Sequence, residues 1–337
     1  MPSYDTALFV GGTRFIGRHT VEAFLDAGYD VTTVTRGEHA DPFADREGVS
    51  NRTGDRTVRE DLEAARDAVD PDVVVDFVAL HPGEVREATD VFADARYVYV
   101  SSGSAYVPGD VPMREDKTEL HPCEPEQEED DDAGTYGPRK AEGDRVVFAA
   151  AEAGVEAMAV RPMLVQGPHD YTERFGYWVD RVAEHDEVLV PGDGGSLLHR
   201  VYVEDLARAL LLVAEEGEPG EAYNAADRSA YSLDRSLELI ADALDTDVTP
   251  VHASERELAA HDVDPGGFPL YTPEPMLVST GKLAALGWES TPPAAYVAET
   301  ARAHVDAGVS GPEESLDRAT EEAVIAALRD GSGEDDE

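Results

Sequence analysis

Tyr136 and Lys140 are the pair of residues in this chain whose types and spacing most directly suggest acid–base chemistry. They lie four positions apart in the segment TYGPRKAEG, which is predicted to be helical, and residues at this spacing share one face of a helix. A free phenol has a pKa of about 10 and is a poor base at neutral pH, but a nearby ammonium group lowers that pKa. The pair could therefore exchange a proton with a substrate hydroxyl or carbonyl. The spacing occurs by chance on many helices, yet Lys140 is one of three lysines in the chain.

A glycine-rich segment near the start of the chain, VGGTRFIG, has the form of a loop that binds the pyrophosphate of a dinucleotide. It follows a predicted strand and opens a predicted helix, which is the context that such a motif requires. Backbone N–H groups and the helix dipole favour a diphosphate there, and a purely structural turn is the alternative. The middle glycine of the G-x-x-G-x-x-G pattern is replaced by Arg14. We predict cofactor contacts from the whole loop: Gly11, Gly12, Thr13, Arg14, Phe15, Ile16 and Gly17.

The end of the second predicted strand bears on which nicotinamide dinucleotide is bound. NAD-binding sites usually place an acidic residue there to hold the ribose 2′-hydroxyl, but this chain has Thr35 and Arg36, with no acid before Glu38. A guanidinium group suits a 2′-phosphate, and Arg14 is a second cation that could reach it. The two arginines favour NADP(H), with NAD(H) as the other option and two plain surface charges as the alternative.

Polar side chains also follow two later strands. Ser101, Ser102 and Ser104 of the segment VSSGSAY come directly after a predicted strand, at the carboxyl end, where open α/β sheets bind their ligands. A serine hydroxyl there can hydrogen-bond a substrate oxygen, and a solvated turn is the alternative. His81 follows the preceding strand and is equally well explained as a substrate contact or as a bystander.

The histidines, the acidic residues and the cysteine of the chain predict neither a metal site nor a catalytic thiol. Among the ten histidines, no pair has metal-ligand spacing supported by acids or cysteine. The acidic run at 124–132 is typical of a solvated loop. Cys123 has no histidine placed by the sequence to activate it.

Strands and helices alternate through the first half of the chain in an order that would bring these side chains to one edge of a sheet. The apolar strands are continuous rather than alternating, which indicates a parallel sheet covered by helices on both faces. A segment rich in proline and acid, 106–135, interrupts the pattern and is predicted to be a long loop, as a lid or an insertion. The predicted strands are 7–10, 31–35, a short one near Val49, 73–80, 96–101 and 155–160; the predicted helices are 15–27, 58–69, 84–93, 136–153, 174–184 and 203–215, with later ones from about Leu233, Pro293 and Pro312.

The charge of the chain is its most unusual bulk property. It has 72 acidic and 27 basic residues, which gives a net charge of −45. Such a chain repels itself at low salt, whereas 1 M salt shortens the Debye length to about 3 Å, so we infer an extremely halophilic source. The same charge argues against a nucleic-acid partner. A single cysteine, no secretory leader pattern and no apolar stretch long enough for a membrane span predict a cytoplasmic protein.

Taken together, the motifs resemble the short-chain dehydrogenase/reductase superfamily, in the extended and atypical branch that contains the NAD-dependent epimerases and dehydratases. The resemblance covers about residues 5–215 well and the rest loosely. One motif, GGTRFIG, is also similar to an atypical subgroup that includes plant chloroplast RNA-associated proteins. The motifs that carry the resemblance are, in order, GGTRFIG, GDRT (54–57), FVAL (77–80), SSGSAY, YGPRK, RPMLVQGP (161–168), PGDGG and VYVEDLA.

The resemblance implies a role for each matching residue. Tyr136 would be the catalytic acid/base, Lys140 would lower its pKa and bind the nicotinamide ribose, and Ser102 would be the catalytic serine, with Ser104 as the second choice. The remaining cofactor contacts would come from Arg36, from Asp55 and Arg56 beside the adenine, from Ala79 and Leu80 beside the ribose and phosphates, and from Pro162 beside the nicotinamide. The implied substrate contacts are His81, Ser104, Met163, His199 and Arg200.

The implied fold is a Rossmann-type doubly wound parallel α/β sheet with a smaller, discontinuous C-terminal substrate lobe. The predicted NAD(P)-binding domain is 1–165 plus about 195–215, the lobe is 166–194 and 216–330, and 331–337 is an acidic disordered tail.

The implied activity is NAD(P)-dependent redox chemistry, as a reductase, epimerase or dehydratase, on a hydroxyl or carbonyl of a sugar or sugar-nucleotide-like substrate. Leu198 and Leu164 depart from the arginine and the asparagine that many sugar-nucleotide enzymes carry at these places. The alternative is a non-catalytic dinucleotide-binding or RNA-associated member of the same fold. We expect a small-molecule substrate and no nucleic-acid or membrane partner; family members often form homodimers through flanking helices, including the helix that carries Tyr136.

Overall fold

The computed structural model describes residues 4–312 and 314–332, and the chain divides into two compact units. Unit 1 consists of residues 1–165, 200–228 and 278–290, and unit 2 consists of 166–199, 229–277 and 291–337. The predicted division placed all of 216–330 in the second lobe. In the structure, 216–228 belongs to unit 1 because it contributes an edge strand to the central sheet, 278–290 also belongs to unit 1, and 195–199, predicted in the binding domain, belongs to unit 2.

Unit 1 is built on a seven-stranded parallel sheet, which confirms the predicted doubly wound α/β fold. The strand order is β11 (Ala222–Ala225), β6 (Ala157–Pro162), β5 (Arg96–Val100), β4 (Val73–Asp76), β1 (Thr6–Val10), β2 (Asp30–Thr35) and β3 (Val49–Thr53). Strands β1, β4, β5 and β6 are buried almost throughout, as expected for a sheet covered on both faces, whereas β2 is partly buried and the edge strand β3 is largely exposed.

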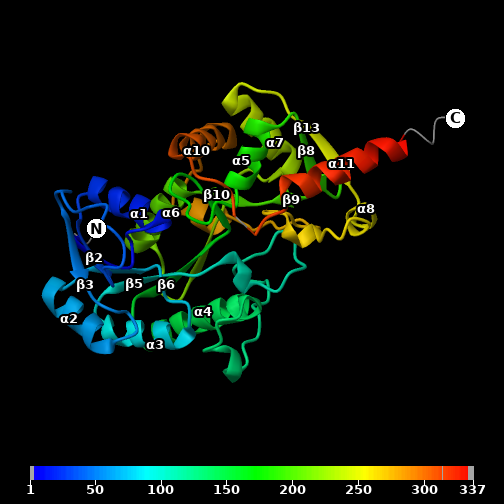
Figure 1. Cartoon of the computed structure of the whole chain (residues 1–337). Coiled ribbons are helices and arrows are strands. Elements are labelled where there is room, and N and C mark those ends of the chain that lie inside the picture. Colours follow the sequence, from blue (N-terminus) through cyan, green and yellow to red (C-terminus); the bar gives the residue numbers. More distant parts are fainter. Residues whose placement is uncertain (1–3, 313, 333–337) are drawn as a thin grey trace. The chain divides into compact units, whose positions relative to one another are not determined.

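Helices cover both faces of this sheet (Figure 1). A large apolar cluster fills the space between the sheet and the helices on one face, with Leu8, Leu62, Val85 and Val147 among its fully buried members. The helices on that face are α2 (Arg59–Val69), α3 (Pro82–Val91) and α4 (Tyr136–Glu152); those on the other are α1 (Phe15–Asp26) and α6 (Val203–Glu216).

Strand β4 is shorter than the sequence predicts. The apolar run continues to Leu80, but the strand ends at Asp76. The Asp76 carboxylate accepts hydrogen bonds from the backbone N–H groups of Val78 (3.2 Å) and Ala79 (3.0 Å), and so turns the chain out of the sheet. The four residues that follow therefore lie at the carboxyl edge of the sheet instead of extending a strand.

The segment 106–135 forms a loop with little regular structure, as predicted, but it is fastened at several points. Tyr106 forms an isolated bridge with Leu120, and Met113 forms one with Val278. Two short 3₁₀ turns, Pro125–Gln127 and Ala133–Thr135, precede α4.

The described residues of unit 2 combine helices with two small two-stranded pairings. Helices α5 (Gly176–Glu184), α7 (Leu233–Leu244) and α10 (Pro293–Ala307) pack against one another. Strand β8 (Glu187–Pro191) pairs in parallel with β13 (Thr249–Ala253). The short strands β9 (Leu197–Leu198) and β12 (Tyr231–Ser232) pair antiparallel. A third pairing, between β7 (Leu164–Gln166) and β10 (Arg200–Tyr202), belongs chiefly to unit 1.

The last helix begins later than predicted. Helix α11 is Arg318–Ser332 rather than a helix from Pro312, because Asp317 accepts hydrogen bonds from the backbone and hydroxyl of Thr320 and so caps the first turn. The predicted disordered tail at 331–337 overlaps the end of this helix, and its residues 333–337 lie outside the described part of the chain. Within that described part, no helix has the length and apolar character needed to cross a membrane.

Candidate active site

The glycine loop connects β1 to α1, and the backbone explains its composition. Gly11 and Gly12 have φ angles of +90° and +98°, a region that side chains rarely tolerate. Gly17 is required for a different reason: a Cβ there would lie 2.2 Å from the Cα of Gly12. The first turn of α1 carries no acidic residue, although the chain as a whole is rich in them. The loop therefore presents bare backbone and the positive end of a helix at the carboxyl edge of the sheet.

Arg14 precedes the first residue of α1, in an extended backbone conformation and with an exposed side chain. Thr13 and Ile16 are half-buried, and Phe15 is buried. The position that usually holds a middle glycine therefore presents a cation to solvent beside the loop.

Two apolar side chains stand exposed next to the glycine loop. Val78 and Leu80, in the turn after β4, are 40% and 45% exposed, while Ala79 between them is fully buried. A Cβ on Gly11 would lie 2.9 Å from a methyl group of Val78, so the two loops touch. Exposed apolar groups beside a bare backbone loop suit a ligand with both apolar and phosphate parts.

Arg36 follows β2, as predicted, and is mostly exposed. Its guanidinium forms an ion pair with Glu38 at 2.9 Å, in which both side chains are more than half exposed; such pairs contribute little to stability. Asp55 is half-buried, and hydrogen bonds from the backbone and hydroxyl of Thr57 lower its pKa, with Arg36 contributing a smaller effect. The end of β2 is thus followed by the Arg36 cation, and the Asp55 carboxylate lies close enough to be affected by its charge.

Arg56 points inward rather than lying at the surface. Its side chain is buried, forms an ion pair with the fully buried Asp76 and lies 3.9 Å from Glu84. The phenol of Tyr97 donates a hydrogen bond to the same Asp76 carboxylate at 3.0 Å. The predicted contact of Arg56 with an adenine ring would therefore have to involve its backbone, because the guanidinium is engaged inside the protein.

Lys140 is buried at the carboxyl ends of two adjacent strands. Its ammonium donates hydrogen bonds of 2.9 Å to the carbonyl of Ala79, after β4, and 2.9 Å to that of Val100, the last residue of β5. It lies 5.9 Å from the centre of the Tyr136 ring and 4.7 Å from that of Tyr99. Burial lowers the pKa of Lys140 from its usual value to about 8.

Tyr136 is the first residue of α4 and is half-buried. Helix α4 places it one turn before Lys140, so the predicted i, i+4 pair lies on one face of a helix, as the spacing requires.

The serine segment lies directly against the start of α4. A Cβ on Gly137 would be 2.5 Å from the carbonyl oxygen of Ser104, so the residue after Tyr136 touches the serine backbone. Ser102 is half-buried and accepts a hydrogen bond from the N–H of Ser104 at 3.1 Å, while Ser104 itself is exposed. Ser101 is buried, and its hydroxyl finds no hydrogen-bond partner among the described residues.

Pro162 and Met163 lie on the other side of the serine segment, at the end of β6. A Cβ on Gly103 would be 2.3 Å from the Met163 sulfur and 3.4 Å from the carbonyl oxygen of Pro162. The structure therefore brings the predicted serine, tyrosine, lysine and nicotinamide-side residues together at the carboxyl edge of β4, β5 and β6.

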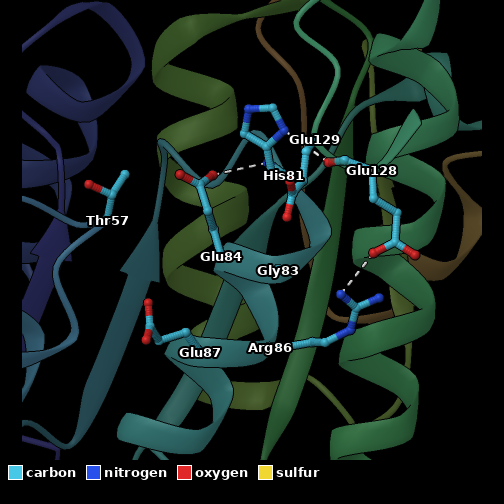
Figure 2. A pocket seen from close by; sticks show the side chains of 8 residues that line it. All are labelled: Thr57, His81, Gly83, Glu84, Arg86, Glu87, Glu128 and Glu129. Carbon is cyan, nitrogen blue, oxygen red and sulfur yellow. Dashed lines mark hydrogen bonds and ion pairs between the residues drawn. The ribbon is translucent and has the colours of Figure 1, made fainter. Parts of the chain in front are cut away.

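His81 lines a neighbouring pocket of about 300 Å³ (Figure 2). Its ring is 3.2 Å from the carboxylate of Asp131 and 3.0 Å from the carbonyl of Glu128, and Glu128 also pairs with Arg86. The acidic loop predicted to be solvated is thus fastened to the start of α3. The pocket is lined by Thr57, His81, Gly83, Glu84, Arg86, Glu87, Glu128 and Glu129.

His199 and Arg200 are both buried, at 9% and 1% exposure. The backbone N–H of His199 bonds to the carbonyl of Met276 within unit 2, whereas Arg200 begins β10 in unit 1. A role in substrate binding stays a prediction for both residues.

Metal-ligand groupings are absent from the described residues, in that no three His, Cys, Asp or Glu side chains are placed to hold an ion. Cys123 is half-buried, and burial raises the pKa of its thiol.

Asp76 is the residue of this region to which the sequence analysis gave no role. The available signal was an acid inside an otherwise apolar strand, VVVDFVAL. Burying a charge is costly unless it is paired and hydrogen-bonded, and the structure supplies Arg56, Tyr97 and two backbone N–H groups for it.

Comparison with known proteins places these features in context. The sequence profile of the NAD dependent epimerase/dehydratase family matches residues 7–226. The chain is 26% identical over 240 residues to the chloroplast stem-loop binding protein of 41 kDa b from Arabidopsis thaliana, covering 67% of this chain and 60% of that protein. It is 26% identical over 309 residues to the low-salt glycan biosynthesis protein Agl12 from Haloferax volcanii, covering 84% of this chain and 92% of that protein.

Among solved structures, dTDP-glucose 4,6-dehydratase from Bacillus anthracis in complex with NAD matches with a TM-score of 0.71 and 19% identity. The match covers 90% of this chain and 97% of that one. The likeness extends through both units and shows a shared fold.

Proposed function

Because this chain belongs to the NAD-dependent epimerase/dehydratase family, we propose that it is a nicotinamide-dinucleotide-dependent enzyme. It acts on a hydroxyl or carbonyl of a sugar or sugar-nucleotide-like substrate, with Tyr136, Lys140 and Ser102 as catalytic residues. The observation that carries the proposal is the position of Lys140, whose ammonium is held at the carboxyl ends of two strands and 5.9 Å from the Tyr136 ring.

The residues at the carboxyl edge of the sheet fit a dinucleotide. Gly11, Gly12 and Gly17 leave the backbone bare at the start of α1, where a pyrophosphate is favoured. The exposed side chains of Val78 and Leu80 would contact its ribose and ring portions. When bound, the nicotinamide supplies the hydride acceptor or donor.

The chain's own residues supply the proton chemistry. With a pKa of about 8, Lys140 is mostly protonated at neutral pH, and its charge stabilises the phenolate form of Tyr136. The phenol can then take a proton from a substrate hydroxyl or return one to a carbonyl. Ser102 would hold the same substrate oxygen, because the serine segment lies against the first turn of α4.

The substrate class rests on relatives rather than on a mapped pocket. The Haloferax relative carries a glycan-biosynthesis name, and the Bacillus structure is a dTDP-glucose dehydratase. Both names concern activated or polymerised sugars, and this supports a sugar-nucleotide substrate for the present chain.

For the cofactor, we propose NADP(H) in preference to NAD(H), on the strength of Arg36 and Arg14. Arg36 is exposed and held only by a surface pair with Glu38, so it could turn to a 2′-phosphate at little cost. The Bacillus structure contains NAD, and equal stabilisation by NAD and NADP would remove this preference.

A second candidate function is RNA association on the same fold, which the Arabidopsis stem-loop binding protein favours. The chain spans 60% of that relative, and its charge of −45 opposes binding to phosphates. Retention of a labelled RNA stem-loop at 2 M KCl would support this function, whereas release with rising salt to background levels counts against it.

The experiment that tests the enzyme function is Tyr136→Phe, assayed at high KCl with dTDP-glucose and UDP-glucose and with both cofactors. Turnover should fall by about 100-fold or more, while thermal stabilisation by the cofactor is kept. Tyr29→Phe is the matched control, because Tyr29 lies just before β2, at the opposite edge of the sheet. Full activity in Tyr136→Phe would overturn the mechanism.

A further inference from the structure

A buried charged pair lies at the end of the strand whose following turn binds Lys140. Asp76 is fully buried at the end of β4, and Arg56 is 8% exposed. One carboxylate oxygen of Asp76 accepts hydrogen bonds from both the Arg56 guanidinium and the Tyr97 hydroxyl. Two Arg56 nitrogens, Nε and Nη1, have no hydrogen-bond partner among the described residues, and Nη1 lies 3.9 Å from a Glu84 carboxylate oxygen, so the side-chain hydrogen bond of the guanidinium is the one to Asp76.

The other oxygen of Asp76 connects this pair to Lys140. This oxygen accepts hydrogen bonds from the backbone N–H groups of Val78 and Ala79. The carbonyl of Ala79 in turn accepts a hydrogen bond of 2.9 Å from the Lys140 ammonium. One short chain of hydrogen bonds therefore joins Asp76, the turn after β4 and the lysine. The same turn carries the exposed side chains of Val78 and Leu80, and Val78 lies against Gly11 of the glycine loop.

We propose that Asp76 is a positioning residue for Lys140. Its carboxylate holds the turn whose Ala79 carbonyl binds the lysine ammonium and supplies an opposite charge to the lysine, and Arg56 and Tyr97 hold that carboxylate in place. The proposal rests on the proposed function only in assigning the Lys140 charge a role in catalysis, namely the stabilisation of the Tyr136 phenolate. The arrangement itself is independent of any ligand.

The charges around Lys140 show why Asp76 matters most. Burial lowers the pKa of Lys140, and Asp76 has the largest opposing effect, ahead of Asp144 on α4 and Glu84 on α3. Arg56 acts in the opposite direction but less strongly. On the β5 side, the Tyr99 ring faces the ammonium at 4.7 Å.

A purely structural role would not require charges here. Buried ion pairs are often replaced by apolar residues without loss of stability, and the neighbouring residues of β4 are Val73, Val74 and Val75. An acid at this position is therefore better explained by what it does to the adjacent lysine than by its contribution to folding.

The test uses the three lysines of the chain, Lys117, Lys140 and Lys282. Protein labelled with ¹³Cε-lysine gives three signals, and Lys140→Gln identifies the relevant one. Its titration is followed in wild type, in Asp76→Asn and in the neutral pair Arg56→Gln/Asp76→Asn. The neutral pair retains side-chain volume and does not leave the buried Arg56 guanidinium without its carboxylate, so it remains informative where Asp76→Asn alone fails to fold.

We expect the pKa of Lys140 to fall by at least about 1 in the folded neutral pair, because the carboxylate with the largest raising effect on it is gone. The control is Arg181→Gln/Glu321→Gln, a second pair with a fully buried carboxylate, which lies in unit 2 and should leave the titration unchanged. A Lys140 pKa that stays at its wild-type value in the neutral pair overturns the proposal. The measurement needs neither substrate nor cofactor, so its failure is distinct from failure of the proposed function.

Discussion

The Cα of Gly12 lies so close to Gly17 that a Cβ on Gly17 would sit 2.2 Å from it, with the carbonyl carbon and oxygen of Gly12 at 2.6 and 2.7 Å. Backbone atoms cannot move aside as the end of a side chain can. The first turn of α1 is therefore fixed against the glycine loop by the absence of a side chain at one position.

Gly17→Ala should consequently separate α1 from the loop. We expect a loss of about 2 kcal/mol in the free energy of unfolding and loss of thermal stabilisation by NAD and NADP. The control is Gly83→Ala on α3, where a Cβ would meet nothing within 4 Å. A Gly17→Ala protein that both cofactors still stabilise to the wild-type extent would show that the loop does not bind them.

Gly137→Ala tests whether the serine segment and α4 act together. The new methyl group would lie 2.5 Å from the Ser104 carbonyl and should push the serines away from Tyr136. A displacement of about 1 Å can reduce turnover by about 100-fold, so kcat should fall far more than the melting temperature. Gly134→Ala, whose nearest neighbour is the movable end of the Asp132 side chain, should keep near-normal kcat; equal losses in both variants would mean that the contact is unimportant.

Arg36→Leu tests the proposed preference for NADP. Removing the guanidinium should weaken NADP binding by about 10-fold through loss of a charged hydrogen bond, and should leave NAD binding unchanged. The dissociation constants of NADP and NAD, measured by fluorescence titration at moderate and high KCl for wild type and Arg36→Leu, test this prediction. Arg59→Leu, which removes a partly exposed arginine on α2, controls for general changes in charge. If Arg36→Leu changes the affinities for NADP and NAD equally, Arg36 is a surface charge with no role in the choice of cofactor.

The hydrogen bonds of His304 in unit 2 lead us to expect that the folded protein loses stability at high pH. Its ring bonds to Asp180 at 2.6 Å and to Glu173 at 2.8 Å, and these hydrogen bonds raise the pKa of His304 from 6.5 to about 9. The stabilisation is fully present below about pH 6.5 and is lost as the pH rises through 9.

Urea unfolding between pH 6 and 10 measures this effect. His304→Gln should cost about 2 kcal/mol at pH 7 and should flatten the pH dependence between pH 7 and 10. The exposed pair of His252 with Asp234 provides the control, because His252→Gln should cost well under 1 kcal/mol. An unchanged alkaline limb in His304→Gln would refute the assignment.

The charge of −45 predicts that the protein needs salt. The acidic residues are spread along the chain, so screening should relieve repulsion throughout the fold. We expect the melting temperature to rise by about 10 °C or more between 0.1 and 2 M KCl. Sucrose of equal osmolarity serves as the control, and an equal rise in sucrose would attribute the effect to solute exclusion instead of screening.

The sequence by itself determined the class of fold and the place of the site in it. Continuous apolar strands alternating with amphipathic helices specify a parallel sheet, because each pattern reflects the local geometry of a few residues. The glycine loop, the serine segment and the Tyr136–Lys140 spacing each follow or face a strand end, so their common location at the carboxyl edge could be predicted without knowing the strand order.

Only the tertiary structure decided which distant residues meet. Asp76 and Arg56 are twenty positions apart and pair inside the protein, and Lys140 binds carbonyls at positions 79 and 100. Such contacts depend on strand order and on which face of each element is buried. Strand β4 ends at Asp76 although its apolar run continues, because a buried carboxylate must find donors, and the donors nearest in the sequence are backbone N–H groups two and three residues ahead.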